Sequence, residues 1–406
     1  MVENNILIPE KEALNLVKNH FSEEVNGNVD NRIQVEKELL NYLIETDDGS
    51  YTLNSQDFKG KTETMHTSHG AITESLEKFV KPIFEDNSLK EINVLDICCG
   101  FGYNSAALIE YLNICNSSDI KLNIDLIEIS LETLAMGLIV PSPIKSHIFV
   151  KKAIETKLVT ENYARLNEIS INIPENLILN IFSEDARQTI QKLNNNYYDA
   201  VFLDPFSPNK SPELYTLEFF QELTKKMKYD GVIATYTSSA PVRSALILAG
   251  FFIGQGPIYG RKSGGTLASL NKDKIKTNLT VNDERMIALS DAGIPFHDYN
   301  LKQSADEIFL NRKNERNNAR HKYKLSSAVK TPVYLGKSLD MDKIGRRVTR
   351  NINKLNISST TSDEAYFLIC PQNDSCICNC NSHRFTNSTN RIIEMSKRLS
   401  KLTSSN

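Results

Sequence analysis

Ile-Asn-Val-Leu-Asp-Ile-Cys-Cys-Gly-Phe-Gly-Tyr-Asn, residues 92–104, is the stretch that decides the fold. An apolar run rich in β-branched residues ends in an acid and small residues, and a helical pattern follows. This order predicts a buried parallel strand, a glycine turn and the start of a helix. Gly100 and Gly102 allow positive φ and a close approach of the backbone to a ligand, and the helix N-terminus offers unpaired N–H groups. The stretch predicts a ligand-binding loop or, alternatively, a purely structural turn.

Strand and helix patterns alternate from residue 92 to residue 270, which predicts an α/β fold. The last two strands follow each other without a helix, so we expect a Rossmann-like parallel sheet with an antiparallel last strand. Residues 141–175 are predicted to form an inserted helical segment. The predicted strands are Val94 to Ile97, Ile124 to Ile129, Leu177 to Phe182, Ala200 to Leu203, Val232 to Tyr236, Phe251 to Gly254 and Thr266 to Leu270.

Acidic residues stand at the ends of four successive predicted strands. Asp96 closes the first strand, Glu128 the second and Asp204 the fourth, while Asp185 follows the third. Ligands of such sheets bind at the carboxyl ends of the strands. Glu128 is placed to accept hydrogen bonds from ribose hydroxyls, and Asp185 to meet an adenine amino group. Because acids are rare in buried strands, the series predicts a nucleoside-containing cofactor, although each acid could instead cap a helix.

The missing motifs narrow the choice of cofactor. A dinucleotide fold would show a third glycine, but position 105 is Ser, and no phosphate-loop pattern ending in Gly-Lys-Ser/Thr occurs. The acidic series with a reversed last strand instead resembles the class I S-adenosylmethionine methyltransferases.

Three further stretches resemble the methyltransferase domain of the MnmC family, over roughly residues 48–335. They are Asp48 to Leu53 with Met65-His66 and Gly70 to Ser75; Leu203 to Thr216, Leu-Asp-Pro-Phe-Ser-Pro-Asn-Lys-Ser-Pro-Glu-Leu-Tyr-Thr; and Thr235 to Thr237 with Val242-Arg243, Ala249 to Phe252 and Gly260 to Ala268. Ile294 to Phe296 and Ser326 to Val329 extend the similarity. Two departures stand out: Cys98 replaces the usual first glycine of the loop, and the oxidase half of bifunctional members has no counterpart.

The resemblance implies methyl transfer from S-adenosylmethionine to the amine of 5-aminomethyl-(2-thio)uridine at the tRNA wobble position. With no oxidase half in the chain, another enzyme would have to deliver that amine. The polar residues 64–71 form a helix cap or a lid over the site. The expected cofactor-binding residues are Met65, His66, Glu74, Asp96, Gly100, Gly102, Tyr103, Asn104, Glu128, Asp185 and Ala186.

Asp204 is the predicted catalytic residue, because an alkyl ammonium group with a pKa near 10 must be held and lose a proton before methylation. Asp204 would act as a general base or only orient the amine. Alternatively, its role is purely structural and it forms a turn before Pro205. Phe206 and Tyr236 would stack on the wobble base or pack in the core. The basic residues would meet phosphates or stay solvated. The predicted substrate residues are Pro205, Phe206, Lys210, Tyr236, Arg243, Arg261 and Lys262.

Composition bounds the remaining expectations. The 406 residues carry a net charge of −3, yet residues 301–350 form a basic segment that is either a solvated helix face or a polyanion-binding surface. No membrane span or targeting segment is recognisable, which favours a cytoplasmic protein. Nothing in the sequence indicates the oligomeric state. The predicted parts are a helical extension (1–48), an entry segment (49–91), the methyltransferase domain (92–300), the basic segment (301–350) and a Cys-containing tail (351–406).

The tail holds five potential soft ligands, Cys370, Cys376, Cys378, Cys380 and His383. They suggest zinc, but Cys-x-Cys-x-Cys is not the usual knuckle spacing, and a poorly ordered tail with free thiols is the alternative.

Two rival functions compete with the tRNA methyltransferase. One is a polyamine aminopropyltransferase, although its glycine-richer loop and N-terminal hairpin domain are absent here. The other is a non-catalytic RNA-binding protein that works through the tail and the basic segment.

Overall fold

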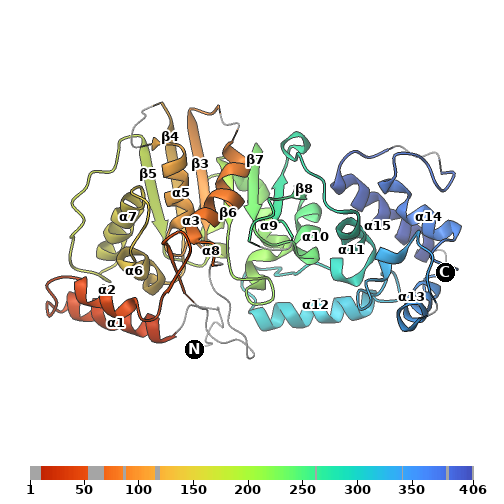
Figure 1. Ribbon diagram of the computed structural model, residues 1–406, viewed down its shortest axis with the longest axis horizontal. Coiled ribbons are helices and arrows are strands. Elements are labelled where there is room, and N and C mark those ends of the chain that lie inside the picture. Colours follow the sequence, from red (N-terminus) through yellow and green to blue (C-terminus); the bar gives the residue numbers. More distant parts are fainter. Residues whose placement is uncertain are drawn as a thin grey trace. The chain divides into compact units, whose positions relative to one another are not determined.

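The structure is a computed structural model of the chain (Figure 1). It describes residues 11–53, 68–85, 88–114, 119–260, 263–340, 342–380 and 384–404. The chain divides into two compact units: residues 1–214, 225–236 and 256–265 form the first, and residues 215–224, 237–255 and 266–406 the second. The five parts expected from the sequence stay predictions.

The first unit alternates strands and helices, as the hydrophobic pattern predicts. A two-stranded hairpin, β1 (Ile44–Glu45) with β2 (Tyr51–Thr52), precedes a continuous helical stretch. That stretch comprises α3 (Ala71–Ser75), a π-helical turn (Leu76–Val80) and α4 (Lys81–Phe84). The other elements are α1 (Lys11–Val25), α2 (Ile33–Leu39), β3 (Glu91–Ile97), α5 (Tyr103–Tyr111), β4 (Lys121–Ile127), α6 (Leu131–Ile139), α7 (His147–Thr160), β5 (Leu177–Phe182), α8 (Ala186–Lys192), β6 (Tyr198–Leu203) and β7 (Met227–Thr235).

The second unit is mainly helical around an antiparallel pair of strands, β8 (Phe252–Gln255) and β9 (Thr266–Ser269). Helix α9 (Leu217–Lys226) begins in this unit and ends in the first. The other helices are α10 (Ala240–Ala249), α11 (Val281–Leu289), α12 (Ala305–Ala319), α13 (Lys343–Asn353), α14 (Asp363–Ile369) and α15 (Ser388–Ser404). The seven long strands form one mixed sheet in the order β5-β4-β3-β6-β7-β9-β8, which confirms the predicted fold class.

The five parallel strands of the first unit end at one level. Ile97 pairs with Ile127 and with Leu203, Ile127 pairs with Phe182, and Leu203 pairs with Thr235. All of these strands except β5 are buried over most of their length, as expected for a parallel sheet covered by helices on both faces. The residue after each strand end therefore emerges at the same edge.

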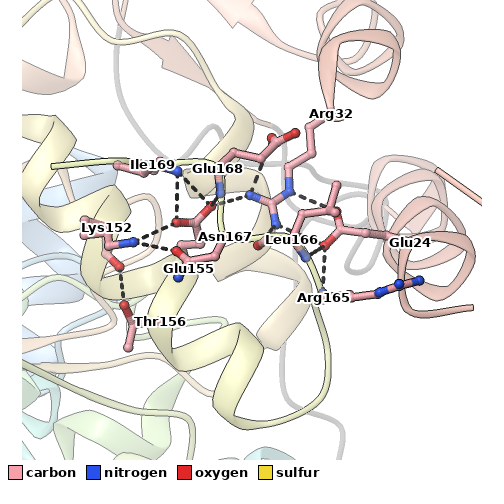
Figure 2. Close-up of polar contacts among 10 residues, drawn as sticks. All are labelled: Glu24, Arg32, Lys152, Glu155, Thr156, Arg165, Leu166, Asn167, Glu168 and Ile169. Carbon is pink, nitrogen blue, oxygen red and sulfur yellow. Dashed lines mark hydrogen bonds and ion pairs between the residues drawn. The ribbon is translucent and has the colours of Figure 1, made fainter. Parts of the chain in front are cut away.

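The N-terminal helices are attached to the first unit by a buried ionic cluster, which we call the Arg32 clamp (Figure 2). Arg32 Nε donates to Glu24 at 2.9 Å, and Nη1 donates to Glu155 of α7 at 2.8 Å. Its Nη2 donates to the carbonyl of Leu166 at 2.7 Å. Both carboxylates are fully buried and also accept main-chain N–H groups of residues 165–169. Helix α1 also lies against α6 (Figure 1).

Two expectations need correction. The segment 141–175 is helical only at α7. Residues 161–176 contain neither helix nor strand, and main-chain N–H groups among them donate to Glu24 and Glu155 of the Arg32 clamp. The alternative of a poorly ordered tail does not hold for the described residues beyond 350, because α14 and α15 bury Leu368, Ile392, Met395 and Leu399. Among the described residues, no helix is both long and apolar enough to cross a membrane.

Candidate functional site

The site lies at the carboxyl edge of the parallel strands in the first unit. Because the strand ends share one register, Cys98, Glu128, Asp204 and Tyr236 directly follow paired residues of four adjacent strands. Burial raises the pKa of the Cys98 thiol, and so do the negative charges of Glu128, Asp204, Asp96 and Asp185. The four acids predicted from the strand ends thus all raise the pKa of one thiol, that of Cys98 in the loop after β3.

The loop after β3 runs through three left-handed residues. Cys98 has φ 61°, Gly100 55° and Gly102 81°. The loop therefore keeps a glycine-like conformation where the family pattern has its first glycine, although cysteine pays a steric cost there. A Cβ on Gly102 would lie 2.5 Å from Val150 Cγ1, so only glycine lets α5 begin this close to α7.

His147 supports the same loop from α7. Its Nε2 lies 2.8 Å from the carbonyl oxygen of Phe101. Burial lowers the pKa of His147 to about 3, with a further contribution from the charge of Lys151. The imidazole is therefore neutral at physiological pH and donates to the carbonyl through Nε2. No sequence signal pointed to this contact, because His147 lies 46 residues away along the chain.

Asp96 is completely buried at the end of β3. Its Oδ2 accepts a hydrogen bond from Ser105 at 2.7 Å, whereas its Oδ1 has no hydrogen-bond partner among the described residues. Burial raises the pKa of Asp96 to about 6, and the hydrogen bonds of Ser105 and Asn104 oppose that rise. An unpaired buried carboxylate oxygen next to a glycine loop suits a cationic or hydrogen-bond-donating ligand.

Glu128 reaches back to the glycine loop. Its Oε2 accepts from the N–H of Gly100 at 3.3 Å, and Oε1 accepts from the N–H of Ser130 at 3.1 Å. Burial raises the pKa of Glu128 to about 7, against the lowering effect of these main-chain donors. A carboxylate can accept about four hydrogen bonds, so this one retains acceptor capacity for a pair of hydroxyls.

Asp185 caps a helix, which is one of the two roles predicted for it. Its Oδ1 accepts from the N–H of Arg187 at 2.9 Å and so caps α8, which is the bland alternative considered for these acids. Its Oδ2 forms an ion pair with Arg187 Nη2 at 2.7 Å. Ala186 is buried as the first residue of α8. A contact of Asp185 and Ala186 with an adenine ring stays a prediction.

Asp204 follows β6 and is held by a short chain of polar residues. Asn104 Nδ2 donates to Asp204 Oδ2 at 3.2 Å, and Ser75 Oγ donates to Asn104 Oδ1 at 2.7 Å. Burial raises the pKa of Asp204 to about 7; the Asn104 hydrogen bond lowers it and the charge of Asp96 raises it further. A carboxyl group with a pKa near neutrality is suited to accept a proton at physiological pH.

Sequence reasoning missed two groups on the helical stretch after β2. Ser75 orients Asn104, as described above, and Lys78 forms a buried ion pair with Glu74 at 2.7 Å. The charge of Lys78 also lowers the pKa of Asp204. The four-residue spacing of Glu74 and Lys78 on one helix was a usable signal for the ion pair. Ser75 offered no such signal, because its partner belongs to another helix.

Asp48 fixes the start of that helical stretch. Its carboxylate accepts from the N–H of Thr73 at 2.8 Å and from the hydroxyl of Ser50 at 2.6 Å. A Cβ on Gly70, which has φ 110°, would lie 1.9 Å from Asp48 Cγ. Residues 68–70 thus lead directly into the helix, while residues 64–67 of the predicted cap or lid lie outside the described residues and the lid stays a prediction. The predicted cofactor residues Met65 and His66 lie outside the described residues.

Tyr103 completes the cofactor-side set. It is almost completely buried at the start of α5, and its hydroxyl accepts from the N–H of Tyr51 at 3.2 Å. Its ring lies 5.1 Å from that of His147. The tyrosine therefore links the hairpin β1-β2 to the helix that begins at the glycine loop.

The predicted substrate residues fall into two groups. Tyr236 and Pro205 are joined by a hydrogen bond from the tyrosine hydroxyl to the proline carbonyl at 2.9 Å, and Phe206 is half-buried beside them in sequence. Lys210 is buried in the same unit. Arg243, in the second unit, is 1% exposed, and it donates to Thr266 and pairs with Asp283 at 3.0 Å. Arg261 and Lys262 lie outside the described residues. Phosphate contacts of all four basic residues stay predictions.

Comparisons with known proteins agree with this geometry. A family described as S-adenosyl-L-methionine-dependent methyltransferases matches residues 150–271. An uncharacterised protein of Methanocaldococcus jannaschii is 33% identical over 321 residues, which cover 78% of this chain and 85% of that protein. The crystal structure of MnmC2 from Aquifex aeolicus is similar with a TM-score of 0.54 and 27% identity, covering 75% of this chain and 99% of that one.

A shorter match names a reaction. The tRNA 5-methylaminomethyl-2-thiouridine biosynthesis bifunctional protein MnmC of Ralstonia nicotianae is 39% identical over 71 residues. That segment covers 18% of this chain and 11% of that protein.

Proposed function

Because this chain belongs to the S-adenosyl-L-methionine-dependent methyltransferases and carries an MnmC-type methyltransferase domain, we propose that it methylates the amine of 5-aminomethyl-(2-thio)uridine at the tRNA wobble position. The observation that supports this substrate is Asp204, a half-buried carboxyl group at the carboxyl edge of the strands, whose pKa is raised to about 7. The name of the shorter match indicates the same class of nucleoside.

The residues of the strand edge fit the cofactor. The left-handed turn at Cys98, Gly100 and Gly102 brings the backbone close to a ligand, and Asp96 Oδ1 and Glu128 retain acceptor capacity. S-adenosylmethionine, when bound, supplies a methyl group on a positively charged sulfur. Acids clustered at this edge favour such a cation, and a cation would in turn lower their pKa values and keep them ionised.

Asp204 then positions the amine. A protonated amine must give up a proton before its lone pair can attack, and the ionised Asp204 accepts that proton or the N–H hydrogen bonds. Asn104 fixes the carboxylate through Oδ2, which leaves Oδ1 for the substrate. Since Asn104 is itself held by Ser75, the geometry is set before substrate arrives, and positioning supplies much of the rate.

The nucleic-acid partner is proposed to be tRNA, with Phe206 and Tyr236 as candidate stacking platforms for the wobble base. Helix α13 of the second unit carries the exposed residues Lys343, Arg346, Arg347 and Arg350 on one side and buries Gly345, Val348 and Ile352 on the other. This helix is the part of the basic segment best suited to phosphates. In α12, by contrast, Arg312 and Arg316 hold main-chain carbonyls and Asp291.

The test is nucleoside mass spectrometry of hypomodified tRNA after incubation with the protein and methyl-labelled cofactor. We expect one labelled methyl on the aminomethyl uridine with the wild-type chain and strongly reduced label with Asp204→Asn. A primary amine that persists despite measurable cofactor binding would contradict the substrate assignment. Label on another nucleoside would redirect it.

Two rival functions predict different results for the same purified protein. A polyamine aminopropyltransferase would consume decarboxylated S-adenosylmethionine with putrescine, and we expect no product. A non-catalytic RNA-binding protein would bind tRNA equally well with or without Asp204 and would incorporate no methyl group.

A further inference from the structure

Four cysteines of the second unit meet at one point. Cys370 directly follows α14 and is completely buried, while Cys376, Cys378 and Cys380 come from the loop that leads to α15. Their sulfur atoms all lie within 4.8 Å of one another. This cluster, which we call the thiol cluster, has no role in the methyl transfer described above.

The sulfur separations identify the kind of site. Cys370 Sγ lies 3.9 Å from both Cys376 Sγ and Cys380 Sγ, and the latter two are 3.8 Å apart. A tetrahedral zinc ion with Zn–S bonds of about 2.3 Å holds its sulfurs about 3.8 Å apart. A disulfide requires about 2.05 Å. A multi-iron cluster distributes its four thiolates over two or four irons and so holds at least some of the sulfurs further apart.

The backbone conformation of Asn379 helps to explain how cysteines with the unusual Cys-x-Cys-x-Cys spacing can share one site. Successive side chains of an extended segment point to opposite sides, while residues two apart point the same way. Asn379 takes a left-handed conformation with φ 57°, which bends the chain between Cys378 and Cys380. Asparagine adopts this conformation more readily than most residues. Beyond this bend, the sulfur of Cys380 lies next to those of Cys370 and Cys376.

Two arginines face the sulfurs. Arg384 Nη1 lies 3.5 Å from Cys370 Sγ, and Arg398 Nη2 lies 3.4 Å from Cys380 Sγ. Four thiolates around a divalent ion carry a net charge of −2, which two guanidinium groups offset. Such N–H···S contacts are the outer shell that orients metal ligands.

Arg398 also connects the thiol cluster to the helices on either side. It lies on α15, is 2% exposed, and donates to the carbonyl of Phe367 on α14 at 2.8 Å. It pairs with Glu394 at 2.9 Å and stacks over the Phe367 ring at 4.7 Å. A bound metal would thus join α14, the loop and α15 through one centre.

We propose that Cys370, Cys376, Cys378 and Cys380 bind one zinc ion as a closed structural site of the second unit. Four thiolates fill a tetrahedral shell, so no position is left for a substrate or an activated water. Binding releases the thiol protons to solvent and stabilises the folded state of this unit. The residue His383, considered as a ligand from the sequence, lies outside the described residues, and the site does not require it.

The experiment uses the full chain, purified without a metal-binding tag, and measures metal by mass spectrometry. We expect about one zinc per chain in the wild type and less than about a tenth of that in Cys376→Ser and Cys378→Ser. Cys99→Ser, which removes a buried thiol in the first unit, is the matched control and should keep the zinc.

A second measurement covers the case in which the cysteine variants fail to fold. The wild-type chain is stripped with a chelator and titrated with Co²⁺, and we expect the intense visible absorption of tetrahedral cobalt thiolate, saturating at one ion per chain. Loss of metal should also lower the melting midpoint, and zinc should restore it. A metal-free purified chain that gives no cobalt signal, a disulfide among these cysteines, or a bound iron cluster would each overturn the proposal.

Discussion

Two groups of carboxylates in the first unit, one fully buried and one half-buried, behave in opposite ways. In the Arg32 clamp, Glu24 accepts hydrogen bonds from Arg32 and from the N–H groups of Arg165 and Leu166 (Figure 2). Burial alone would raise the pKa of Glu24, but these donors lower it below its ordinary value. At the strand edge, the pKa values of Asp204 and Glu128 rise to about 7, because their donors do not compensate for burial.

The difference separates structure from function. A carboxylate whose acceptor capacity is used within the protein contributes to stability, and nothing further is needed to keep it ionised. A buried carboxylate with too few donors destabilises the folded chain, and a cationic ligand supplies what is missing. We therefore propose the strand edge as the ligand site and the clamp as part of the scaffold that holds it.

The largest effect is expected where the comparison concerns catalysis. Asp204→Asn keeps the shape and the neighbour Asn104 but removes the charge and the proton acceptor, so methyl incorporation should fall by about 10²–10⁴-fold. Single-turnover kinetics with labelled cofactor measure the rate. Circular dichroism and cofactor titration are the controls, since the fold and cofactor binding should persist. A variant with wild-type rate would remove Asp204 from the reaction.

The next effect breaks the clamp. Arg32→Ala leaves two buried carboxylates, Glu24 and Glu155, without their shared cation, and should lower the free energy of unfolding by about 3–5 kcal/mol. Urea denaturation followed by circular dichroism measures this loss. Lys121→Ala, which breaks an exposed pair with Glu91, is the matched control and should change stability by less than about 1 kcal/mol. Equal losses for both variants would contradict the role of the clamp.

The pH dependence of stability should distinguish the two groups of carboxylates when one residue of each is replaced by glutamine. The folded-state pKa of Glu24 is lowered, so its stabilising contribution is present above the unfolded pKa and is lost as pH falls through the folded value. Glu24→Gln should therefore destabilise the chain at pH 8 and have a smaller effect near pH 4.

Glu128 should show the opposite sign. Its folded-state pKa is raised from 4.5 to about 7, so the folded state binds the proton more tightly and stability is lost as pH rises from about 4.5 to 7. Glu128→Gln removes that loss and should stabilise the cofactor-free chain at pH 8 but not at pH 4, while weakening cofactor binding. Thermal melts at both pH values test the pair. If both variants changed the stability at pH 8 in the same direction, the distinction between the two groups of carboxylates would not hold.

The smallest effect concerns the turn between the acids. Cys98 holds a left-handed conformation that costs a non-glycine residue about 1–2 kcal/mol, so Cys98→Gly should offset part of that cost. The gain should stay below about 1 kcal/mol because glycine also loses more chain entropy on folding. Urea denaturation without cofactor is the measurement. A clear loss of stability would show that the thiol itself packs favourably there.

The sequence alone was enough for the parts that depend on neighbouring residues. All seven strands lie where the apolar runs predict them, with ends that differ by a few residues, and the acids stand at the strand ends. Each strand is signalled within its own four to nine residues, since burial on both faces favours a continuous apolar run. The catalytic candidate Asp204 was found in this way.

Contacts between distant segments decided the rest. Arg32 meets Glu155, 123 residues away, and no periodicity marks such a pair. The same holds for Ser75 with Asn104 and for His147 with the glycine loop. In the thiol cluster the sequence supplied the cysteines, but their spacing argued against a usual zinc knuckle. In the tertiary structure, where Asn379 is left-handed, the sulfurs lie within 4.8 Å of one another.

The sequence by itself thus determined which residues could carry the chemistry, because strand ends and small-residue turns are local features of the chain. The tertiary structure decided which of those groups are satisfied and which remain available. That distinction depends on donors from other segments, since the pKa and the hydrogen-bond capacity of a buried carboxylate follow from everything packed around it.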